Sequence, residues 1–382
     1  MELDLNEIRA AITDTDKEII QLFKKRMALC ESVAQYKKQH NLPVYDAARE
    51  RTLLSKISDM AGEEYEKYAL TLYHTMMDVS KAYQHTKLSP TSQIYSIIQD
   101  SLENTPKIFP KKVKIACQGV EGAYSQIATG RFFELPSITY YPSFDGVFSA
   151  IEKGECRYGV LPIENSTAGS VKKVYELMIH HNFHIVKSLR LKVDHNLLVK
   201  RGVKLENIKE IFSHEQAINQ CSGFLSRLGG VKITVCENTA MAAKLVAESG
   251  RDDIGALSSR SCAELYGLDN IAPSVQDMGN NYTRFICISK EPEIYPGADK
   301  CSIMLVTANR PGVLYNVLSC FNALGINMTK LESTPIPDRD FESMFYFDFS
   351  VSVYSDDLKQ LLCELEARSE RFRFLGAYSE IL

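Results

Sequence analysis

The feature that most constrains the fold of this chain is the stretch Leu5–Gln39, which contains neither glycine nor proline. Its apolar residues recur mostly at intervals of three and four, the spacing that gathers side chains on one face of a helix. They are Ile8, Ile12, Ile19, Leu22, Phe23, Leu29 and Val33. We therefore expect one unbroken helix that ends at or just before Pro43. Such a long helix cannot bury its apolar stripe well within one small domain, so we expect it to pair with a second chain.

Two further helices are expected before the composition changes. One begins near Asp46, and the other runs from about Glu63 to Lys87. Residues 89–110 then mix Ser, Pro, Thr and Asn with one short apolar stretch, a composition typical of a linker. The pattern therefore predicts an all-α domain over 1–88 and a linker over 89–110.

The chain beyond residue 110 alternates short apolar runs with helical stretches. The runs include VKIAC, YGVLPI, IKEIF, VKITVC, IGALS and RFICIS, and the helical stretches include Phe144–Lys153 and Thr239–Ala247. This alternation predicts an α/β domain over 111–290. After a second break at EPEIYPGAD, the order strand, helix, strand, strand, helix predicts a small α+β domain of the split-βαβ kind over 299–382.

Charge, hydropathy and cysteine usage argue against several functional classes. The 44 basic and 48 acidic residues give a net charge of −4 with no block of like charge, so we expect no nucleic-acid partner. No apolar run is long enough for a membrane span, and the N-terminus lacks the layout of a signal peptide. The ten cysteines form no CxxC pair, which indicates reduced thiols and a cytoplasmic protein rather than a disulfide framework or a zinc site.

Three histidines lie close together in the sequence and are a candidate metal site. His180 and His184 have the spacing that can bind a metal on a helix, and His181 lies beside them. The sequence offers no clear third ligand, and a surface helix end explains the cluster equally well. We therefore expect no metal and no cofactor.

Polar residues of the helical region share faces. Arg26 and Lys37 are eleven residues apart, so at ~100° per residue they point within ~20° of one another on one helix. Arg9 lies seventeen residues before Arg26 and diverges from it by ~100°. The other polar residues share single helical turns: Asp46, Arg49 and Glu50 on one, Ser80 and Gln84 on another. Each alone could be a solvated surface residue.

As a set, these residues resemble the all-helical chorismate mutase family, in which two intertwined three-helix protomers build two identical sites. The resemblance covers residues 5–85 and rests on Ile8-Arg9, the Arg26–Lys37 stretch and PVYDAARE at 43–50. The resemblance implies that Arg26, and Arg9 reaching in from the partner chain, hold the two carboxylates of chorismate, with Ser80 supporting a carboxylate. Lys37 and Gln84 would donate to the ether oxygen. Glu50 and the Asp46 backbone would accept from the ring hydroxyl, and Arg49 belongs to the same motif.

The implied reaction suits this set. The rearrangement of chorismate needs no nucleophile and no proton transfer, so the site must hold a dianion in its reactive conformation. It must also stabilise the negative charge that grows on the ether oxygen. Bidentate guanidinium groups match the carboxylates, and fixed donors match the oxygen.

Four motifs stand out in the central domain. CQGVEGAYS at 117–125 is a glycine-containing turn that could offer backbone N–H groups to an anion or could simply be tight. The others are polar segments next to predicted strands: LPIENSTAGSV at 161–171, SHEQAINQC at 213–221 and NYTRF at 281–285. In this order and spacing they resemble prephenate dehydratase over residues 112 to about 290. The resemblance implies two α/β lobes around a cleft, similar to periplasmic binding proteins.

The same resemblance implies the residues of the cleft. Thr283 and Arg284 would be central, and the residues lining the cleft would be Asn165, Ser166, Thr167, Ser213 and Gln220. The implied reaction removes carbon dioxide and hydroxide from prephenate, so a donor is needed at the leaving hydroxyl. Thr283 is too weak an acid to transfer its proton freely, and we expect it to donate a hydrogen bond. Glu164 could instead be a general acid if the cleft raises its pKa, or a structural carboxylate.

Residues 299–382 resemble an ACT regulatory domain, a small ligand-sensing module that pairs side by side between chains. The matching motifs are NRPGVL at 309–314 and LESTP at 331–335. The resemblance implies that L-phenylalanine binds at Asn309, Pro311, Gly312, Val313, Leu314, Glu332 and Ser333. The dehydratase family usually has Glu-Ser-Arg-Pro in the second motif, whereas this chain has Thr334 at the arginine position. A dimerisation domain without a ligand is the alternative.

Taken together, the three resemblances predict a bifunctional enzyme of phenylalanine biosynthesis. It would convert chorismate to prephenate and prephenate to phenylpyruvate, under feedback inhibition by L-phenylalanine, as a homodimer or homotetramer. Two alternatives remain: an inactive amino-acid sensor, and an enzyme with one activity whose mutase helices serve only for assembly. The intact sets of site residues favour the bifunctional enzyme over the sensor.

Overall fold

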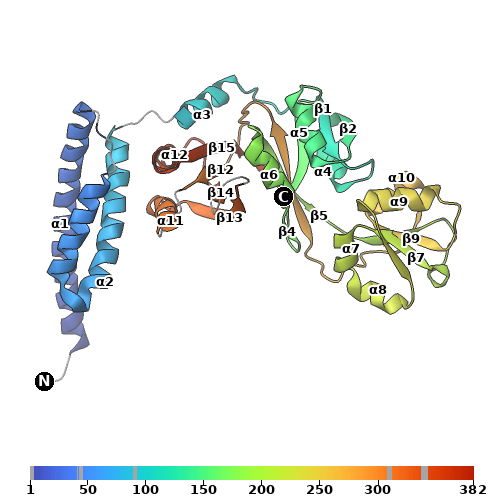
Figure 1. Ribbon diagram of the computed structural model, residues 1–382, viewed down its shortest axis with the longest axis horizontal. Coiled ribbons are helices and arrows are strands. Elements are labelled where there is room, and N and C mark those ends of the chain that lie inside the picture. The colour runs from blue at the N-terminus through green and yellow to red at the C-terminus, as the bar shows by residue number, and fades with distance from the viewer. Residues whose placement is uncertain (1–3, 41, 43–45, 89–92, 308–311, 337–342) are drawn as a thin grey trace. The chain divides into compact units, whose positions relative to one another are not determined.

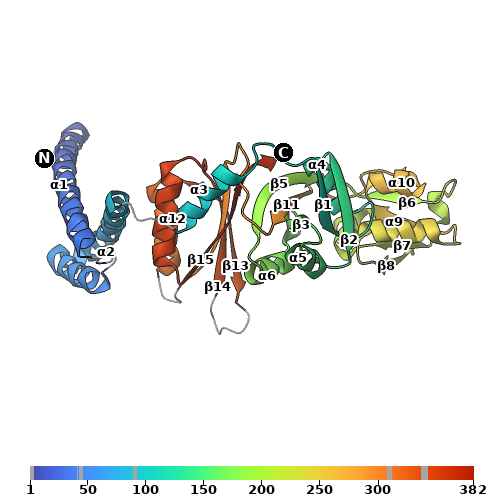
Figure 2. The ribbon, with the colours of Figure 1, turned by 90° about the horizontal axis from the view of Figure 1, so that it is seen from above.

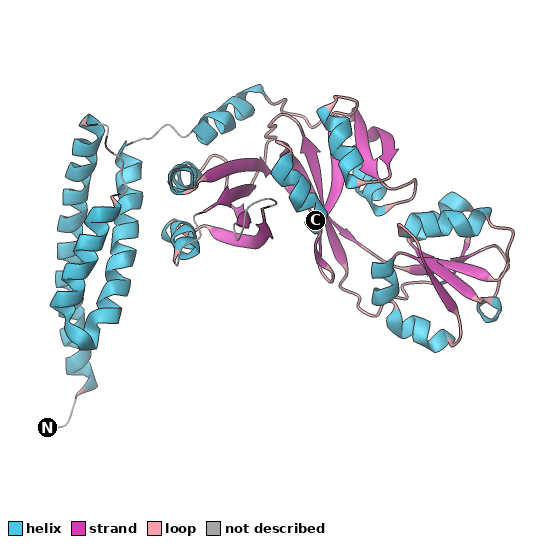
Figure 3. Ribbon diagram, in the orientation of Figure 1, coloured by secondary structure: helices cyan, strands magenta, loops and turns pink. Residues whose placement is uncertain are grey.

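The structure of this chain, a computed structural model, describes residues 4–40, 42, 46–88, 93–307, 312–336 and 343–382. The chain divides into two compact units. One unit holds Met1–Ile97 and Met304–Arg373, and the other holds Ile98–Ile303 and Phe374–Leu382. Figure 1 labels the helices and strands, and Figure 3 separates them by type.

Two long helices form the N-terminal region, and they lie alongside one another in Figures 1 and 2. Helix α1 (Leu5–Gln39) is continuous, as predicted, and begins where the Asp4 side chain accepts a hydrogen bond from the backbone N–H of Asn6 at 2.8 Å. Helix α2 (Ala47–Leu88) consists of two helical segments that meet at Gly62, whose φ of +70° and ψ of 168° break the helix. The predicted second and third helices are therefore these two segments.

The segment predicted as a linker contains a helix, α3 (Gln93–Asn104). One face of this helix is covered, because Ile98 and Ser101 are buried while Asp100 between them is exposed. No helix in the described part of the chain is both long enough and apolar enough to span a membrane.

The C-terminal region has the order βαββαβ. Its elements are β12 (Lys300–Val306), α11 (Val313–Ala323), β13 (Asn327–Pro335), β14 (Ser343–Ser350), α12 (Asp356–Arg368) and β15 (Arg371–Tyr378). The strands form one sheet in the order β13-β14-β12-β15, and Figure 2 shows α12 running beside it. Phe321 of α11 stacks on Phe347 of β14 with ring centroids 5.6 Å apart, which fixes that helix against the sheet. The first five elements follow the predicted order, and β15 was not predicted.

The central region has two lobes, and the first is built on a mixed sheet in the order β16-β5-β11-β3-β1-β2, with β4 added to β3. The strands are β1 (Lys112–Gln118), β2 (Leu135–Tyr141), β3 (Tyr158–Asn165), β4 (Gly169–Ser170), β5 (His184–Lys192), β11 (Tyr282–Ser289) and β16 (Glu380–Ile381). The helices are α4 (Tyr124–Phe132), α5 (Phe144–Glu152) and α6 (Lys172–His180). Buried residues of β1, β3 and β11 pack against α4 and form its core.

The second lobe holds a five-stranded sheet in the order β10-β6-β9-β7-β8. Its elements are β6 (Asn196–Val199), η1 (Leu205–Asn207), β7 (Glu210–Ser213), α7 (Glu215–Gln220), α8 (Ser222–Leu228), β8 (Lys232–Val235), α9 (Thr239–Glu248), β9 (Ile254–Ser258), α10 (Arg260–Tyr266) and β10 (Asp269–Ala272). Separate apolar clusters cover the two faces of this sheet. The predicted α/β pattern and its two-lobed arrangement are confirmed.

The two lobes are joined by a pair of crossing segments that run side by side. One leads from β5 to β6 and the other from β10 to β11. Val193 N–H donates to the carbonyl of Asn281, and Val275 N–H donates to the carbonyl of His195, both at 2.8 Å. We call this pair of hydrogen-bonded crossing segments the hinge, because paired connections of this kind between two lobes are where small rotations are absorbed.

The last residues of the chain return to the first lobe, which differs from the predicted boundary of 299–382. Strand β16 pairs in parallel with β5, with Glu380 opposite Ser188. Gly376 approaches β5 so closely that a Cβ there would collide with the carbonyl of Ile185. The C-terminal tail therefore belongs to the central fold.

Candidate active sites

The first candidate site lies between α1 and α2. The guanidinium of Arg26 on α1 donates to the hydroxyl of Ser80 on α2 and to the carbonyl of Met76 at 3.4 Å. Ser80 is buried and donates to the same carbonyl at 2.6 Å. Arg26 is thereby held against one face of α2, where it remains half-buried.

Gln84 lies one helical turn beyond Ser80 on the same face of α2. Its side chain is buried, and its Oε1 has no hydrogen-bond partner within the described residues. A buried amide oxygen that lacks a partner carries a free-energy cost, and a donor on a bound ligand would remove that cost. Lys37, also expected here, lies half-buried near the end of α1.

Three charged residues that form ion pairs with one another also lie at this site, and the sequence did not reveal these pairs. We call the three residues the Lys81 relay. Lys81 lies 2.9 Å from Glu50 and 2.9 Å from Asp78, and all three side chains are at most a quarter exposed. Lys81 therefore connects the first segment of α2, which carries Glu50, to the second segment. The i, i+3 spacing of Lys81 from Asp78 and Gln84 was the available signal, but charged residues at that spacing are common on surface helices.

Three expected residues stand apart from this cluster within one chain. Arg9 and Arg49 are exposed, and at 1.5 Å of rise per residue Arg9 lies ~26 Å along α1 from Arg26. Asp46 begins α2: its carboxylate accepts from the N–H of Arg49 at 3.0 Å, and its carbonyl accepts from Glu50 at 3.0 Å.

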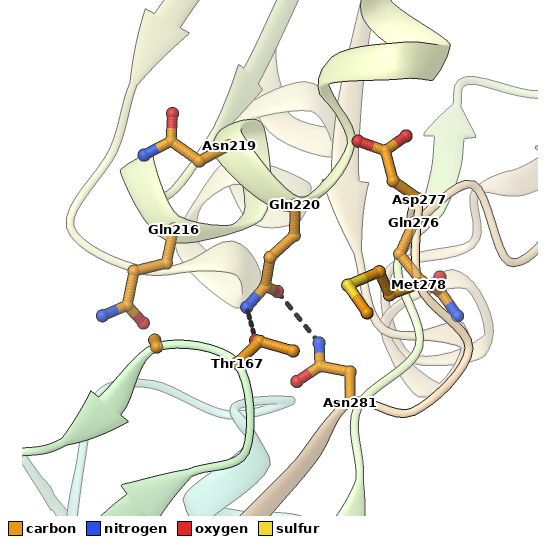
Figure 4. Close-up of a pocket in the computed structure, with 9 residues that line it drawn as sticks. Thr167, Gln216, Asn219, Gln220, Gln276, Asp277, Met278 and Asn281 are labelled. Carbon is orange, nitrogen blue, oxygen red and sulfur yellow. Dashed lines mark hydrogen bonds between the residues drawn. The ribbon is translucent and has the colours of Figure 1, made fainter.

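The second candidate site is a cavity of about 360 Å³ between the two lobes of the central region. It is lined mainly by amide side chains: Thr167, Ala168, Gln216, Asn219, Gln220, Gln276, Asp277, Met278 and Asn281. Figure 4 shows Gln220 between Thr167 and Asn281, with hydrogen bonds to both. The expected residues Thr167 and Gln220 line this cavity, whereas Gln276, Asp277 and Met278 were not anticipated.

Asn165 connects this cavity to β11. Its Oδ1 accepts from the backbone N–H groups of Thr167 at 3.0 Å and Ala168 at 2.8 Å. Its Nδ2 donates to Asn281 Oδ1 at 2.8 Å and to the hydroxyl of Thr283 at 3.0 Å. Backbone N–H groups can only donate, so they determine which end of the Asn165 amide is oxygen. Thr283 is buried and does not line the cavity, and two hydrogen bonds through Asn165 connect it to the lining residue Asn281.

Two other expected residues lie at the same strand ends. Ser166 donates to the carbonyl of Asn280 at 3.0 Å, which ties the turn after β3 to the start of β11. Arg284, which is half-buried, lies 3.8 Å from Glu164 across the pairing of β3 with β11. Attraction to the guanidinium therefore orients the Glu164 carboxylate along the sheet.

Ser213 and the turn at 117–125 form hydrogen bonds within the protein and do not line the cavity. Ser213 is fully buried, and its hydroxyl donates to the carbonyl of Leu257 at 2.8 Å. In the turn at 117–125, the N–H of Gly122 donates to Gln126 Oε1 at 2.5 Å, and the carbonyl of Glu121 accepts from Tyr266 of α10 at 2.6 Å. The turn thus joins the first lobe to the second.

His181, which lies between α6 and β5, has local contacts. The Nδ1 atom of His181 lies 2.5 Å from the Glu152 carboxylate, and its ring stacks on Phe183 with centroids 5.3 Å apart. Among the residues that the structure describes, no group of three or more His, Cys, Asp and Glu side chains could hold a metal ion.

The residues expected to bind an amino acid in the C-terminal region are described in part. Gly312 precedes α11 with a φ of +82°, and the next two residues, Val313 and Leu314, are half-buried. Glu332 and Ser333 lie on β13, where Glu332 is 3.7 Å from Lys330. Asn309 and Pro311 lie outside the described residues.

Comparison with known proteins identifies two matching families. Residues 8–85 match the family described as chorismate mutase type II, and residues 115–293 match the family described as prephenate dehydratase. The chain is 30% identical to the bifunctional chorismate mutase/prephenate dehydratase of Escherichia coli, over 99% of this chain and 96% of that protein. It is 35% identical to arogenate dehydratase/prephenate dehydratase 2 of Arabidopsis thaliana, over 79% of this chain and 81% of that protein.

Solved structures are similar over about two thirds of the chain. A structure described as GqqA, a quorum-quenching acylase, aligns with a TM-score of 0.64 and 31% identity, over 69% of this chain and 97% of that chain. A prephenate dehydratase from Arthrobacter aurescens, in complex with L-Phe, aligns with a TM-score of 0.65 and 23% identity, over 70% of this chain and 90% of that chain. The second likeness shows a shared fold.

Proposed function

The chain belongs to the bifunctional chorismate mutase/prephenate dehydratases and carries both activities, and on this premise we propose which residues perform each reaction and how the enzyme is regulated. The first reaction rearranges chorismate to prephenate, and the second converts prephenate to phenylpyruvate in phenylalanine biosynthesis. We assign the mutase to 1–88 and the dehydratase to 111–290 with the strand Glu380–Ile381. The regulatory domain begins at residue 299.

The mutase site is proposed at the face of α2 that Arg26 contacts. Arg26, held by Ser80, would bind one carboxylate of chorismate, and Arg9 of a second chain would bind the other. Lys37 and Gln84 would donate to the ether oxygen, where negative charge develops as the carbon–oxygen bond breaks. The buried position of Gln84, one helical turn from Ser80 on the same face of α2, supports its place in this site. Glu50, fixed by Lys81, would accept from the ring hydroxyl next to the Asp46 backbone, with Arg49 on the same turn.

A homodimer is proposed because one chain leaves the mutase helices incomplete. On α1, only Ala34 is buried, while Ile12, Leu22 and Leu29 are 55%, 66% and 60% exposed. Apolar residues repeating along a helix for this length form a stripe that a second copy would cover. The ~26 Å that separates Arg9 from Arg26 along α1 supports the same proposal, because two chains would bring one of each residue to a site.

The dehydratase site is proposed around Thr283, and the observation that carries it is the direction of the hydrogen bond from Asn165. An amide N–H can only donate, so Thr283 Oγ1 accepts there and keeps its own hydrogen for another acceptor. We assign that hydrogen to the leaving hydroxyl of prephenate. As the carbon–carboxylate bond breaks, its electron pair moves into the ring, carbon dioxide departs, and the carbon–oxygen bond to the hydroxyl breaks. The departing hydroxide then takes a proton from solvent.

Arg284 and Glu164 are proposed to act as a unit in this reaction. Arg284 would bind the side-chain carboxylate of prephenate, and Glu164 would hold the guanidinium in position from 3.8 Å. This arrangement favours Thr283 over Glu164 as the group that assists the leaving hydroxyl. The lining residues Thr167 and Gln220, with Asn165 and Ser166 beside them, would orient the substrate, and Ser213 would support the lobe behind them.

Inhibition by L-phenylalanine is proposed for the C-terminal domain, which resembles an ACT domain. Its βαββαβ order and the left-handed Gly312 before α11 support this assignment, because a turn of that kind exposes backbone groups that can bind the charged ends of an amino acid. Val313, Leu314, Glu332 and Ser333 would complete the site together with Asn309 and Pro311. The L-Phe complex of a prephenate dehydratase of the same fold is a further reason to propose it.

One experiment tests the proposal as a whole. Purified protein is incubated with chorismate at neutral pH, and prephenate and phenylpyruvate are quantified with and without L-phenylalanine. We expect phenylpyruvate to form and its rate to fall when L-phenylalanine is present. Unchanged rates at saturating L-phenylalanine would reject the regulatory part alone, and failure to consume added prephenate would reject the dehydratase part. Adding arogenate to a parallel reaction measures which of the two substrates named for the plant relative is preferred.

A further inference from the structure

His195 is a buried histidine in the crossing segment between β5 and β6, and no sequence motif pointed to it. Its side chain is 3% exposed, and its Nε2 lies 2.9 Å from Gln220 Oε1. Its backbone is fixed on both sides, because its N–H donates to Gln276 Oε1 at 3.0 Å and its carbonyl accepts from Val275 at 2.8 Å. The residue therefore joins the hinge to α7, the helix that carries a cavity-lining amide.

The direction of every hydrogen bond leading to His195 follows from backbone groups. The N–H groups of Thr167 and Ala168 make Asn165 Oδ1 an acceptor, so Asn165 Nδ2 is the donor to Asn281. The receiving atom of Asn281 is then its oxygen, which leaves Asn281 Nδ2 to donate to Gln220 at 2.9 Å. The atom of Gln220 that accepts this bond is Oε1.

This orientation fixes the proton on His195. Because Gln220 Oε1 is an acceptor, His195 Nε2 must carry a hydrogen and donate it. Gln220 Nε2 then donates to the hydroxyl of Thr167 at 2.7 Å, and that hydroxyl donates to Asn165 Oδ1 at 2.7 Å. The amides and hydroxyls form a closed circuit with one direction, and His195 supplies a donor to it from outside the cavity.

Burial also determines which form of the imidazole is present. It lowers the pKa of His195 below the ordinary value for histidine, so the ring is neutral at pH 7. With the hydrogen on Nε2, the buried Nδ1 is bare, and it has no partner within the described residues. A neutral donor can orient the amide of Gln220 without adding positive charge next to a cavity that must bind an anion.

The geometry points to His195 as a positioning residue of the dehydratase. It holds the Gln220 amide with its nitrogen toward Thr167 and so maintains the closed circuit, from which Asn165 donates to Thr283. Without the donor on His195, Gln220 Oε1 would keep only the bond from Asn281, and the amide could rotate. The inference rests on the dehydratase activity of the family and concerns a residue that does not line the cavity.

The test compares two substitutions of the same residue in the full-length protein. His195→Phe keeps a planar ring and removes the donor, whereas His195→Gln can extend an N–H donor to about the position of Nε2. We expect His195→Phe to lower kcat for prephenate by about tenfold or more with KM within about threefold, because a positioned group acts mainly in the transition state. His195→Gln should recover activity to within about threefold of wild type.

A matched control separates positioning from loosening of the hinge. Tyr124 donates to the carbonyl of Asp194, the neighbour of His195, at 2.6 Å and does not contact Gln220. Tyr124→Phe removes a hydrogen bond from the same segment, and we expect a change in kcat of less than about threefold. A loss equal to that of His195→Phe would overturn the inference, because any weakening of the hinge would then have the same effect.

A double substitution tests whether His195 acts through Gln220. If it does, His195→Phe combined with Gln220→Leu should be no slower than Gln220→Leu alone, because the orientation of an absent amide cannot matter. Multiplied losses in the double variant would overturn the inference. Circular dichroism and thermal unfolding of the same preparations report whether each variant is folded, and mutase activity on chorismate reports on the other unit of the chain. If His195→Phe reduced both activities in parallel while His195→Gln did not recover the dehydratase, the residue would be structural.

Discussion

Asn165 donates a hydrogen bond to the hydroxyl of Thr283 at 3.0 Å, across the position where β3 and β11 pair these two residues. The orientation of the amide is fixed by two backbone N–H groups, so the direction of this bond is determined. Thr283 thus accepts from Asn165 and presents its single hydrogen elsewhere, which is the property required of a donor to a leaving hydroxyl.

The first prediction concerns the Thr283 hydroxyl. Thr283→Val, which has nearly the same shape, should lower dehydratase kcat by ~100-fold or more, because no donor would remain at the leaving oxygen. Thr283→Ser keeps the hydroxyl and should stay within about tenfold of wild type. Steady-state kinetics with prephenate measure both. Equal losses in Val and Ser variants would show that the methyl group, and not the hydroxyl, is required.

The second prediction concerns Arg26. Arg26→Ala should lower mutase kcat/KM by ~1000-fold, because the site would lose a fixed cation for a substrate carboxylate. Arg26→Lys should recover only part of this loss, since an ammonium group cannot form the bidentate pair. Dehydratase activity on added prephenate is the control and should be retained. A lysine variant with full mutase activity would contradict bidentate binding.

The third prediction concerns the Lys81 relay. Lys81→Met leaves Glu50 and Asp78 without their shared cation, and because these groups are largely buried we expect a stability loss of ~1–3 kcal/mol. We also expect a lower mutase rate, since Glu50 would no longer be held in place. Denaturant unfolding followed by circular dichroism measures the first effect, and a chorismate assay measures the second.

Lys17 provides a matched control for the relay. It pairs with Asp14 at 2.8 Å, but both side chains are more than two thirds exposed, so Lys17→Met should change stability by less than ~0.5 kcal/mol. If the Lys81 and Lys17 variants behaved alike, the relay would have no special role.

The fourth prediction concerns the acid dependence of the second lobe. Hydrogen bonds from Lys232, Thr234 and Arg251 hold the pKa of Glu210 at about 2, below its ordinary value. Ionised Glu210 therefore stabilises the fold at neutral pH, and this contribution is lost as the pH falls from ~4.5 through 2. Because Lys232 and Arg251 are substantially exposed, we expect Glu210→Gln to cost only ~1 kcal/mol at pH 7.

Thermal unfolding of the wild type and the Glu210→Gln variant at pH 7 and pH 3 measures this dependence. The difference between the two proteins should be smaller at pH 3, because the unfolded chain binds a proton at Glu210 below pH ~4.5 while the folded chain does so only near pH 2. A difference that grew on acidification would contradict the sign of the linkage.

Much of the fold could be predicted because its elements are specified locally. The absence of glycine and proline predicted α1, and the break before the third helix falls at Gly62. The apolar runs of the central region predicted β1, β3, β7, β8, β9 and β11 within a few residues. In contrast, α3 was missed because its Ser- and Pro-containing flanks resemble a linker. The tail strand β16 was missed because its pairing with β5 joins residues far apart in the sequence.

The candidate sites were only partly predictable, for a related reason. Motif residues such as Asn165, Thr167 and Gln220 carry a recognisable local pattern, and the structure brings them together. His195 and Lys81 have no pattern of their own, since their importance depends on partners that only the folded chain supplies. Ser213 illustrates the reverse case: its motif suggested a place in the cleft, but its hydroxyl is occupied by the carbonyl of Leu257.

We expect two independent sites on one chain to act in sequence, and a mixture of two variants tests this expectation. Arg26→Ala alone should leave chorismate unconverted, and Thr283→Val alone should accumulate prephenate. An equimolar mixture should form phenylpyruvate from chorismate, because prephenate released by one variant reaches the intact dehydratase of the other. If the mixture formed no phenylpyruvate although each variant kept its remaining activity, prephenate would not be released between the sites. If either folded variant had lost both activities, the two-site account would be wrong.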